Sequence, residues 1–213
     1  SPSSISVIGG GEGSTVKAVV NQTLQLVCVV KEARPPPSVA WYRNGIMLDQ
    51  GLHSERIELS SAPRRWSVRS RLSIIPTSED DGQQYSCRAL HPSLMSSPTT
   101  LVASVTLNIL HPPDPPVISG YSAGETLKEG QHRTLICHSR GGNPRPKLTW
   151  YRNGKLLKYQ NITYIKPSNE HEAMKVILQI IVTAEDDRAV YECRADNEVL
   201  RQPFSTNVTL TVH

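Results

Sequence analysis

The sequence predicts an all-β protein of two β-sandwiches in tandem, and three observations support this fold class. The pentapeptide Trp-Tyr-Arg-Asn-Gly occurs at 41–45 and recurs at 150–154, 109 positions later. A cysteine lies thirteen residues before each of these tryptophans. Apolar residues alternate with polar ones over short segments, which is the period of half-buried strands. Because a repeat of about a hundred residues has the size of one domain, we expect two similar domains, at 1–111 and 112–213.

The alternating segments are separated by Pro, Gly, Asn and Ser, and no stretch of ten or more residues has helical spacing. The clearest alternating positions are Leu24, Leu26, Cys28, Val30, Leu72, Ile74, Leu178 and Ile180. Asn44-Gly45 and Asn153-Gly154 end the two pentapeptides, and Asn-Gly accepts the positive φ angles that tight hairpin turns need. Each copy is therefore expected to be a β-sandwich.

Charge is spread evenly along the chain. The formal net charge is +4, with ten Lys and Arg against eight Asp and Glu in residues 1–112, and thirteen against eleven in residues 113–213. No basic stripe or acidic tail is present, so the pattern does not favour nucleic acid as a partner. No apolar run approaches the roughly 20 residues of a spanning helix. Membrane association is expected only through an anchor outside these residues.

The four cysteines favour disulfides over a zinc site. They form two equivalent pairs with separations of 59 and 56 residues, whereas zinc ligands usually come in close pairs. Disulfides indicate an oxidising compartment, and three glycosylation sequons point to the same secreted setting. The sequons begin at Asn21, Asn161 and Asn207.

Further positions match around the second cysteine of each copy. Tyr85 and Tyr191 each lie two residues before a cysteine, and Asp81 and Asp187 each lie four residues before that tyrosine. With the Cys…Trp…Cys spacing, this pattern resembles the immunoglobulin domain over the whole chain.

The resemblance implies a role for each of these residues. Disulfides Cys28–Cys87 and Cys137–Cys193 would join the two sheets of each sandwich, Trp41 and Trp150 would fill the core beside them, and Tyr85 and Tyr191 would form the tyrosine corner. The cysteine spacing leaves little room for the two extra strands of variable-type domains. It therefore favours I-set or C2-like sandwiches of seven or eight strands.

A proline-rich junction separates the two copies. Four prolines in residues 111–116 favour an extended, semi-rigid spacer and hence an elongated arrangement of the domains. The sequence from His111 to Tyr121, with Glu125–Gln131 and Ser139–Pro144, resembles nephrin-like adhesion receptors of the sticks-and-stones and hibris type. Echinoid and nectin-like receptors share parts of this pattern.

This second resemblance implies the extracellular part of a type I membrane protein at the plasma membrane. Such a receptor would bind cell-surface immunoglobulin-superfamily proteins in cis or in trans, homophilically or heterophilically. Two alternatives stay open, namely a soluble or shed ligand-binding receptor or decoy, and a spacer pair with no recognition of its own.

No catalytic or metal-binding motif stands out, so we expect no enzyme, no metal and no cofactor. The stretch from Gly9 to Thr15 has the glycines of a phosphate loop but lacks its lysine and a following helix, which favours a flexible loop. The triplets Glu79–Asp81 and Glu185–Asp187 occupy the same place in both copies, which favours a shared corner motif over a calcium site. The seven histidines form no HExxH pattern.

Strand alternation indicates which residues face outward from the sheet that contains the repeated tryptophan. Neighbours of a buried residue point to the opposite face of a strand. Tyrosine and arginine, two residue types enriched at binding hot spots, fall on that outward face in both copies. The alternative is that the tyrosine covers the sheet edge and the arginine makes a surface ion pair. The candidate partner-binding residues are Tyr42, Ser86 and Arg88 in the first copy and Tyr151, Glu192 and Arg194 in the second.

The stretch from Pro63 to Leu72 is rich in arginine. Trp66 and Val68 are expected to face the core, while the arginines face solvent. These arginines could bind an acidic partner or heparan sulfate. A strand edge protected by charge is the interpretation that we favour.

Overall fold

A computed structural model describes residues 4–8, 15–33, 35–49, 53–59, 64–90, 101–158 and 161–213. The chain divides into two compact units, Ser1–Leu110 and His111–His213, each with its own core. This division falls one residue before the boundary expected from the sequence. The glycine-rich loop prediction at 9–14, and Pro63, lie outside the described residues.

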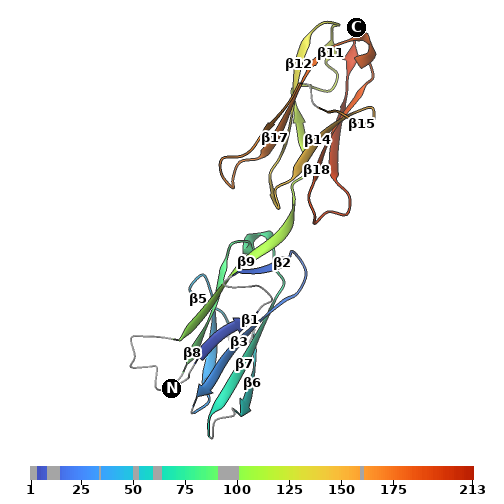
Figure 1. Cartoon of the computed structure of the whole chain (residues 1–213). Coiled ribbons are helices and arrows are strands. Elements are labelled where there is room, and N and C mark those ends of the chain that lie inside the picture. The colour runs from blue at the N-terminus through green and yellow to red at the C-terminus, as the bar shows by residue number, and fades with distance from the viewer. Residues whose placement is uncertain are drawn as a thin grey trace. The chain divides into compact units, whose positions relative to one another are not determined.

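The first unit consists of two facing sheets (Figure 1). One sheet has the strand order β1-β3-β7-β6, and the other contains β9-β8-β4-β5 with β2 parallel to β9. The elements are β1 (Ser4–Ile8), β2 (Thr15–Val19), β3 (Leu24–Ala33), β4 (Ser38–Arg43), β5 (Ile46–Met47), β6 (His53–Leu59), β7 (Trp66–Ile74), the 3-10 helix η2 (Ser78–Asp80), β8 (Gln84–Leu90) and β9 (Val102–Pro113).

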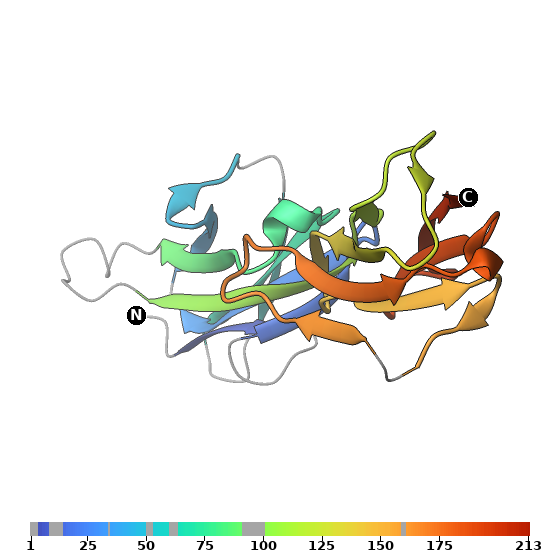
Figure 2. The ribbon, with the colours of Figure 1, turned by 90° about the horizontal axis from the view of Figure 1, so that it is seen from above.

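The second unit repeats this plan (Figure 2). Its sheets have the orders β10-β12-β17-β16 and β15-β14-β18-β19, and β11 pairs with β20 in parallel. The elements are β10 (Val117–Ser119), β11 (Thr126–Leu127), β12 (His132–Ser139), β13 (Gly141–Asn143), β14 (Lys147–Arg152), β15 (Lys155–Leu156), β16 (Ile162–Ile165), β17 (Met174–Ile181), the 3-10 helix η4 (Ala184–Asp186), β18 (Val190–Asp196), β19 (Phe204–Thr209) and β20 (Thr211–Val212).

Each core lies between the two sheets, as the alternating apolar positions require. Trp41 and Trp150 are 1% exposed at the centres of the two cores. The indole nitrogen of Trp41 donates to Ser70 Oγ at 2.9 Å, and that of Trp150 donates to the Val176 carbonyl at 3.4 Å. Full burial of a large apolar side chain contributes roughly 1.5–3 kcal/mol, so these residues are major terms in the stability of each unit.

One disulfide crosses each core. Cys28 on β3 is bonded to Cys87 on β8, and Cys137 on β12 is bonded to Cys193 on β18. Each bond therefore joins one sheet to the other. The all-β prediction is confirmed, and among the described residues no helix has the length and apolarity needed to cross a membrane.

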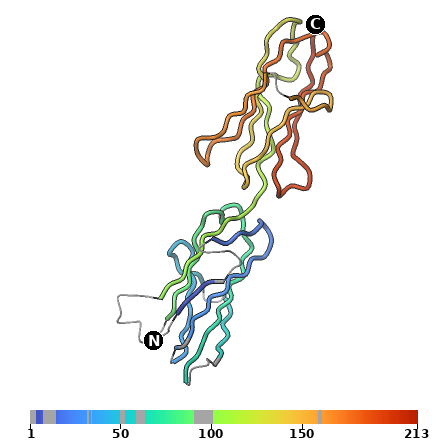
Figure 3. The backbone as a smooth tube through the Cα atoms, in the orientation of Figure 1, coloured from blue at the N-terminus to red at the C-terminus, as the bar shows by residue number. Residues whose placement is uncertain are grey.

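The asparagine of the repeated pentapeptide has two structural roles. Asn44 and Asn153 have φ angles of 50° and 49°, and the glycines that follow them are also in the left-handed region, as a tight hairpin turn requires. The asparagine Oδ1 atoms also accept hydrogen bonds from backbone nitrogens at the start of β8 and β18, the strands that pair with β4 and β14. Gln84 N donates to Asn44 at 2.9 Å, and Val190 N donates to Asn153 at 2.8 Å. Figure 3 shows the chain reversing its direction at the ends of each unit.

The number of strands differs from the seven or eight expected for each sandwich. Among the described residues the first unit has nine strands, β1 to β9, and the second has eleven, β10 to β20. In the first unit the opening segment is divided between β1 in one sheet and β2 in the other. The residues at the start of the proline-rich junction also make strand pairs. Within the second unit, His111 pairs with Asn143 and Pro113 pairs with Gly141, so the last residues of β9 form a short ladder with β13.

Candidate recognition surface

The sheet that contains the repeated tryptophan, called the tryptophan sheet below, is β9-β8-β4-β5 in the first unit and β15-β14-β18-β19 in the second. A stacked tyrosine–arginine pair lies on its outward face in both units. In the first unit the Arg88 guanidinium carbon lies 4.3 Å from the centroid of the Tyr42 ring. In the second unit Arg194 lies 3.8 Å from the centroid of the Tyr151 ring. Both distances are within the range of a cation–π interaction. The structure therefore brings together the tyrosine and the arginine that the sequence selected in each copy.

The strand register explains why these side chains meet. Tyr42 is directly opposite Ser86, so Arg88 is the diagonal neighbour of the tyrosine on the adjacent strand. Long side chains can span the 7–8 Å between diagonal positions. Tyr151 is opposite Glu192 in the same way, which places Arg194 diagonal to it.

The two faces differ at the position between tyrosine and arginine. In the second unit Arg194 Nη2 donates to Glu192 Oε1 at 3.1 Å, and this hydrogen bond raises the pKa of Arg194. In the first unit Ser86 holds that position and has no carboxylate to offer. Among the described residues, the buried Nε of Arg88 has no hydrogen-bond partner. The cation of the second face is thus paired within the unit, whereas that of the first face is stacked on tyrosine without an acid.

The prediction that Ser86 is an exposed contact residue is wrong. Ser86 is only 8% exposed, although its strand position faces outward. Its side chain is short and lies in a row with the much larger Tyr42, so it does not rise to the surface of the sheet. Of the three candidates in the first unit, Tyr42 and Arg88 are the two that are not buried.

The acidic triplets form a corner within each unit. In the second unit the Tyr191 hydroxyl donates to Asp186 Oδ1 at 2.7 Å, and Arg152 Nη2 lies 3.2 Å from the same oxygen. The other carboxylate oxygen accepts from the backbone nitrogen of Thr183 at 2.9 Å. Asp187 instead accepts from the Val212 backbone nitrogen at 3.0 Å. The carboxylates of Asp186 and Asp187 thus hold parts of the domain together.

This environment shifts two pKa values in opposite directions. Burial of the phenol, and then its hydrogen bond to Asp186, raise the pKa of Tyr191 from 10.0 to about 12. Burial alone would raise the pKa of Asp186, but hydrogen bonds from Thr183, Tyr191 and Arg152 outweigh it and lower the pKa below its ordinary value. The arginine is the third residue of each pentapeptide, and its repetition was the signal for a role that the sequence interpretation missed.

The first unit has the equivalent corner. Tyr85 donates to Asp80 Oδ1 at 3.3 Å, and Arg43 Nη2 lies 3.2 Å from that oxygen. Asp81, the residue singled out in the sequence, instead accepts from the backbone nitrogen of Ile109 at 2.8 Å. The second aspartate of each triplet thus anchors the last strand, while the first receives the tyrosine and arginine.

The arginine-rich stretch is not a strand edge, so that interpretation is wrong. Its strand, β7, lies between β3 and β6 in the sheet. Val68 is buried and Trp66 is half-buried, as expected, while Arg69 lies 3.7 Å from Glu58 on β6. The charges in this region therefore include opposite-sign neighbours on β7 and on β6, and β6 is the strand at the edge of the sheet.

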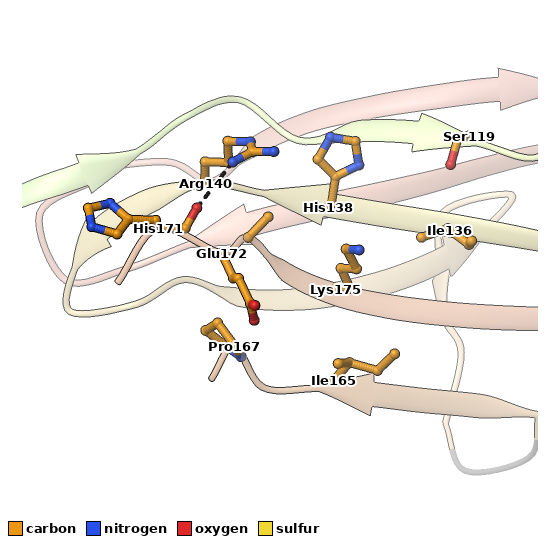
Figure 4. Close-up of a pocket in the computed structure, with 10 residues that line it drawn as sticks. Ser119, Ile136, His138, Arg140, Ile165, Pro167, His171, Glu172 and Lys175 are labelled. Atoms are coloured by element: carbon orange, nitrogen blue, oxygen red, sulfur yellow. Dashed lines mark hydrogen bonds between the residues drawn. The ribbon is translucent and has the colours of Figure 1, made fainter. Parts of the chain in front are cut away.

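A hollow of about 510 Å³ opens on the other sheet of the second unit, and Figure 4 shows the side chains that line it. Arg140 Nη1 donates to the His171 carbonyl at 3.1 Å. Glu172 Oε2 accepts from both the nitrogen and the hydroxyl of Ser168 at 2.9 Å. Arg140 and Glu172 thus hold the loop before β17.

The sequons occupy different parts of the units. Asn21 and Asn161 are exposed and have φ angles of 65° and 64°, at the turn between β2 and β3 and just before β16. Asn207 is exposed in the middle of β19, which belongs to the tryptophan sheet.

Two family models match the chain. The model described as CD80-like C2-set immunoglobulin domain matches residues 8–98, and the model described as immunoglobulin domain matches residues 115–197. The chain belongs to the immunoglobulin superfamily. Its two units are immunoglobulin domains, and their disulfides, tryptophans and corner tyrosines occupy the positions that this fold requires.

Several curated proteins are similar to this pair of immunoglobulin domains. Mouse nephrin is 31% identical over 202 residues, which is 94% of this chain and 15% of nephrin. Human Kin of IRRE-like protein 2 is 29% identical over 154 residues, or 72% of this chain and 20% of that protein. Neural cell adhesion molecule L1 of Takifugu rubripes is 31% identical over 200 residues, or 93% and 14%. The chain thus spans no more than a fifth of each of these relatives.

Solved structures share the fold. The structure described as Rst D1-D2 has a TM-score of 0.63 and 22% identity, covering 97% of this chain and 99% of that one. The ectodomain of mouse nectin-like molecule 4 has the same TM-score and identity, covering 100% and 65%. The sequence similarity confirms the expected resemblance to nephrin-like adhesion receptors. Immunoglobulin-domain receptors of this kind are a non-enzymatic family, as expected for this chain.

Proposed function

We propose that this pair of immunoglobulin domains belongs to the extracellular part of a cell-surface adhesion or recognition receptor, and that it binds another immunoglobulin-superfamily protein. The observation that carries the proposal is the tyrosine–arginine pair, which recurs on the outward face of the same sheet in both domains. Similarity to nephrin and to neural cell adhesion molecule L1 supports the adhesion role. The disulfides and exposed sequons support an extracellular location.

The chemistry of the surface suits a protein partner. Tyrosine and arginine supply large contact areas and are enriched among hot-spot residues. Arg88 has a stacked guanidinium with no acid among the described residues, so a carboxylate on the partner would complement it. Arg194 already has Glu192 as its partner.

Binding can be tested with the secreted two-domain protein, displayed on beads and as a soluble multimer. The probes are the same protein and a set of extracellular immunoglobulin-superfamily proteins from the same organism. Aggregation of like beads would indicate homophilic binding, and binding to a member of the set would indicate heterophilic binding. The test variant carries both Tyr42→Asp and Tyr151→Asp, and we expect it to lose binding.

Tyr164→Asp is the matched control, because Tyr164 is 59% exposed on β16, in the opposite sheet of the second domain. We expect the control to bind like the wild type. Unchanged binding by the double variant would remove the tyrosine face from the proposal, and a wild type that binds no probe would favour a spacer role instead.

A further inference from the structure

The last strand of the tryptophan sheet differs between the two domains at one outward position. In the second domain, Tyr151 on β14, Glu192 on β18 and Asn207 on β19 are consecutive cross-strand partners. In the first domain the same row reads Tyr42, Ser86 and Ser104. Asn207 begins the sequon Asn-Val-Thr, whereas Ser104 begins Ser-Val-Thr. The two domains thus differ by a glycosylation acceptor placed on the candidate recognition face.

Asn207 is well placed to carry a glycan. Burial alternates along β19, with Ser205, Asn207 and Thr209 exposed and their neighbours half-buried. The strand ends the order β15-β14-β18-β19, so its outward side chains lie at the rim of the face. Of the three sequon asparagines, only Asn207 lies in a tryptophan sheet. Each sequon asparagine is exposed, but a glycan at Asn21 or Asn161 would not start on this face.

We propose that an N-linked glycan on Asn207 covers the Tyr151–Arg194 face of the second domain, and that recognition is confined to the Tyr42–Arg88 face of the first. The restriction to the first domain rests on the proposed function, whereas the covering of the second does not. The partner is an immunoglobulin-superfamily surface that brings a carboxylate to Arg88.

The dimensions of the sheet support the covering. Neighbouring strands are about 4.8 Å apart, so Asn207 lies roughly 10 Å from Tyr151 across two strand spacings. A branched glycan of several sugars is bulky and hydrated on that scale. Glu192 lies directly between them in the row, and Arg194 is the diagonal neighbour of Asn207 on β18.

A second, independent difference points the same way. Arg194 is already paired with Glu192 at 3.1 Å, so this arginine does not lack an acid. Arg88 keeps a buried Nε without a partner among the described residues. The second domain thus has both the sequon and an arginine that is paired with a glutamate. The first domain has no sequon on this face, and its arginine has no acid among the described residues.

The covering can be tested without any partner. Mass spectrometry of glycopeptides from the protein secreted by eukaryotic cells should show sugar on Asn207. Phenylglyoxal modifies arginine side chains, and we expect it to modify Arg194 severalfold faster in Asn207→Gln than in the wild type. The rate at Arg88 should be unchanged. An unmodified Asn207, or equal Arg194 rates in the two proteins, would overturn the covering.

The restriction to the first domain can be tested by moving the glycan. Ser104→Asn converts Ser-Val-Thr into Asn-Val-Thr at the equivalent position, with one substitution. Val102→Asn creates Asn-Ala-Ser opposite Arg88, at a residue that is 40% exposed, and serves as a second variant. We expect either glycosylated variant to weaken binding to the probe by roughly tenfold or more in Kd, while Asn207→Gln retains the wild-type affinity.

Matched controls separate the sugar from the substitution. Ser104→Asn combined with Thr106→Ala keeps the asparagine but removes the sequon, and it should bind like the wild type. Melting temperatures of all variants establish that they are folded. Full binding by a variant with a glycan at position 102 or 104, or loss of binding in Asn207→Gln, would overturn the restriction. A wild type that binds no probe would refute the proposed function. Glycan occupancy at Asn207 and the rate at which phenylglyoxal modifies Arg194 would still decide whether the glycan covers the second domain's face.

Discussion

The corner at Tyr191 predicts that the second domain loses stability in alkaline solution. The pKa of Tyr191 in the folded chain is about 12, against an ordinary value of 10.0. Above pH 10 the unfolded chain therefore releases the phenol proton while the folded chain still holds it. Because the folded-state pKa is raised, stability is full below pH 10 and falls as the pH rises toward 12. A shift of about 2 pKa units corresponds to roughly 2.7 kcal/mol.

The substitution Tyr191→Phe isolates this effect. It removes the titrating hydroxyl and its 2.7 Å hydrogen bond to Asp186, which costs roughly 1–3 kcal/mol near neutral pH. Every other titrating group is common to the two proteins. The difference in unfolding free energy between wild type and variant should therefore shrink as the pH rises from 10 toward 12. Urea denaturation followed by circular dichroism at several pH values measures this difference, and a gap that stays constant would show that the Tyr191 hydroxyl does not cause the alkaline loss.

Three further predictions concern the second domain and use urea denaturation. The pKa of Asp186 is lowered in the folded chain, so the carboxylate stabilises the fold above its ordinary pKa of 3.8, and this stabilisation is lost as the pH falls through the folded-state pKa. The difference in unfolding free energy between wild type and Asp186→Ala should therefore narrow in acid, and a difference that widens would contradict this. Gly120→Ala should cost at least about 2 kcal/mol, because its Cβ would lie 2.0 Å from the Thr134 carbonyl oxygen, whereas Gly130→Ala meets open space and should cost less; equal losses would be evidence against the clash. Arg188 has a φ of 65°, so Arg188→Gly should stabilise by roughly 0.5–1 kcal/mol, and destabilisation would show that the side chain matters more than the backbone.

The repeated pentapeptide shows how much of the fold was accessible from the sequence. Trp41 could be assigned to the core because it recurs at a fixed distance from a cysteine, and Asn44-Gly45 could be assigned to a turn because few residues accept positive φ. Both assignments depend on local chemistry or on strand period. The ion pair between Arg43 and Asp80 joins residues that are 37 positions apart, and no local sequence pattern predicts it.

The outward face of the tryptophan sheet could be predicted only in part from the sequence. Period-two alternation places Tyr42 and Arg88 on one face, and their stacking follows once the strands are adjacent. Alternation gives the direction of a side chain but not its exposure, which is why Ser86 was wrongly taken as a contact residue. Neighbours across a sheet depend on register, so the row that joins Tyr151 to Asn207 became visible only in the structure. Strand order also depends on pairing between segments that are distant in the sequence, which is why β7 was wrongly placed at an edge.

Recognition by the first domain alone requires that Arg88, and not Arg194, contacts the partner. The most direct test compares the affinities of Arg88→Ala and Arg194→Ala in the glycosylated two-domain protein, against the probe that the wild type binds. We predict that Arg88→Ala weakens binding roughly tenfold or more, while Arg194→Ala changes it less than about twofold. Equal losses, or a larger loss for Arg194→Ala, would contradict the claim.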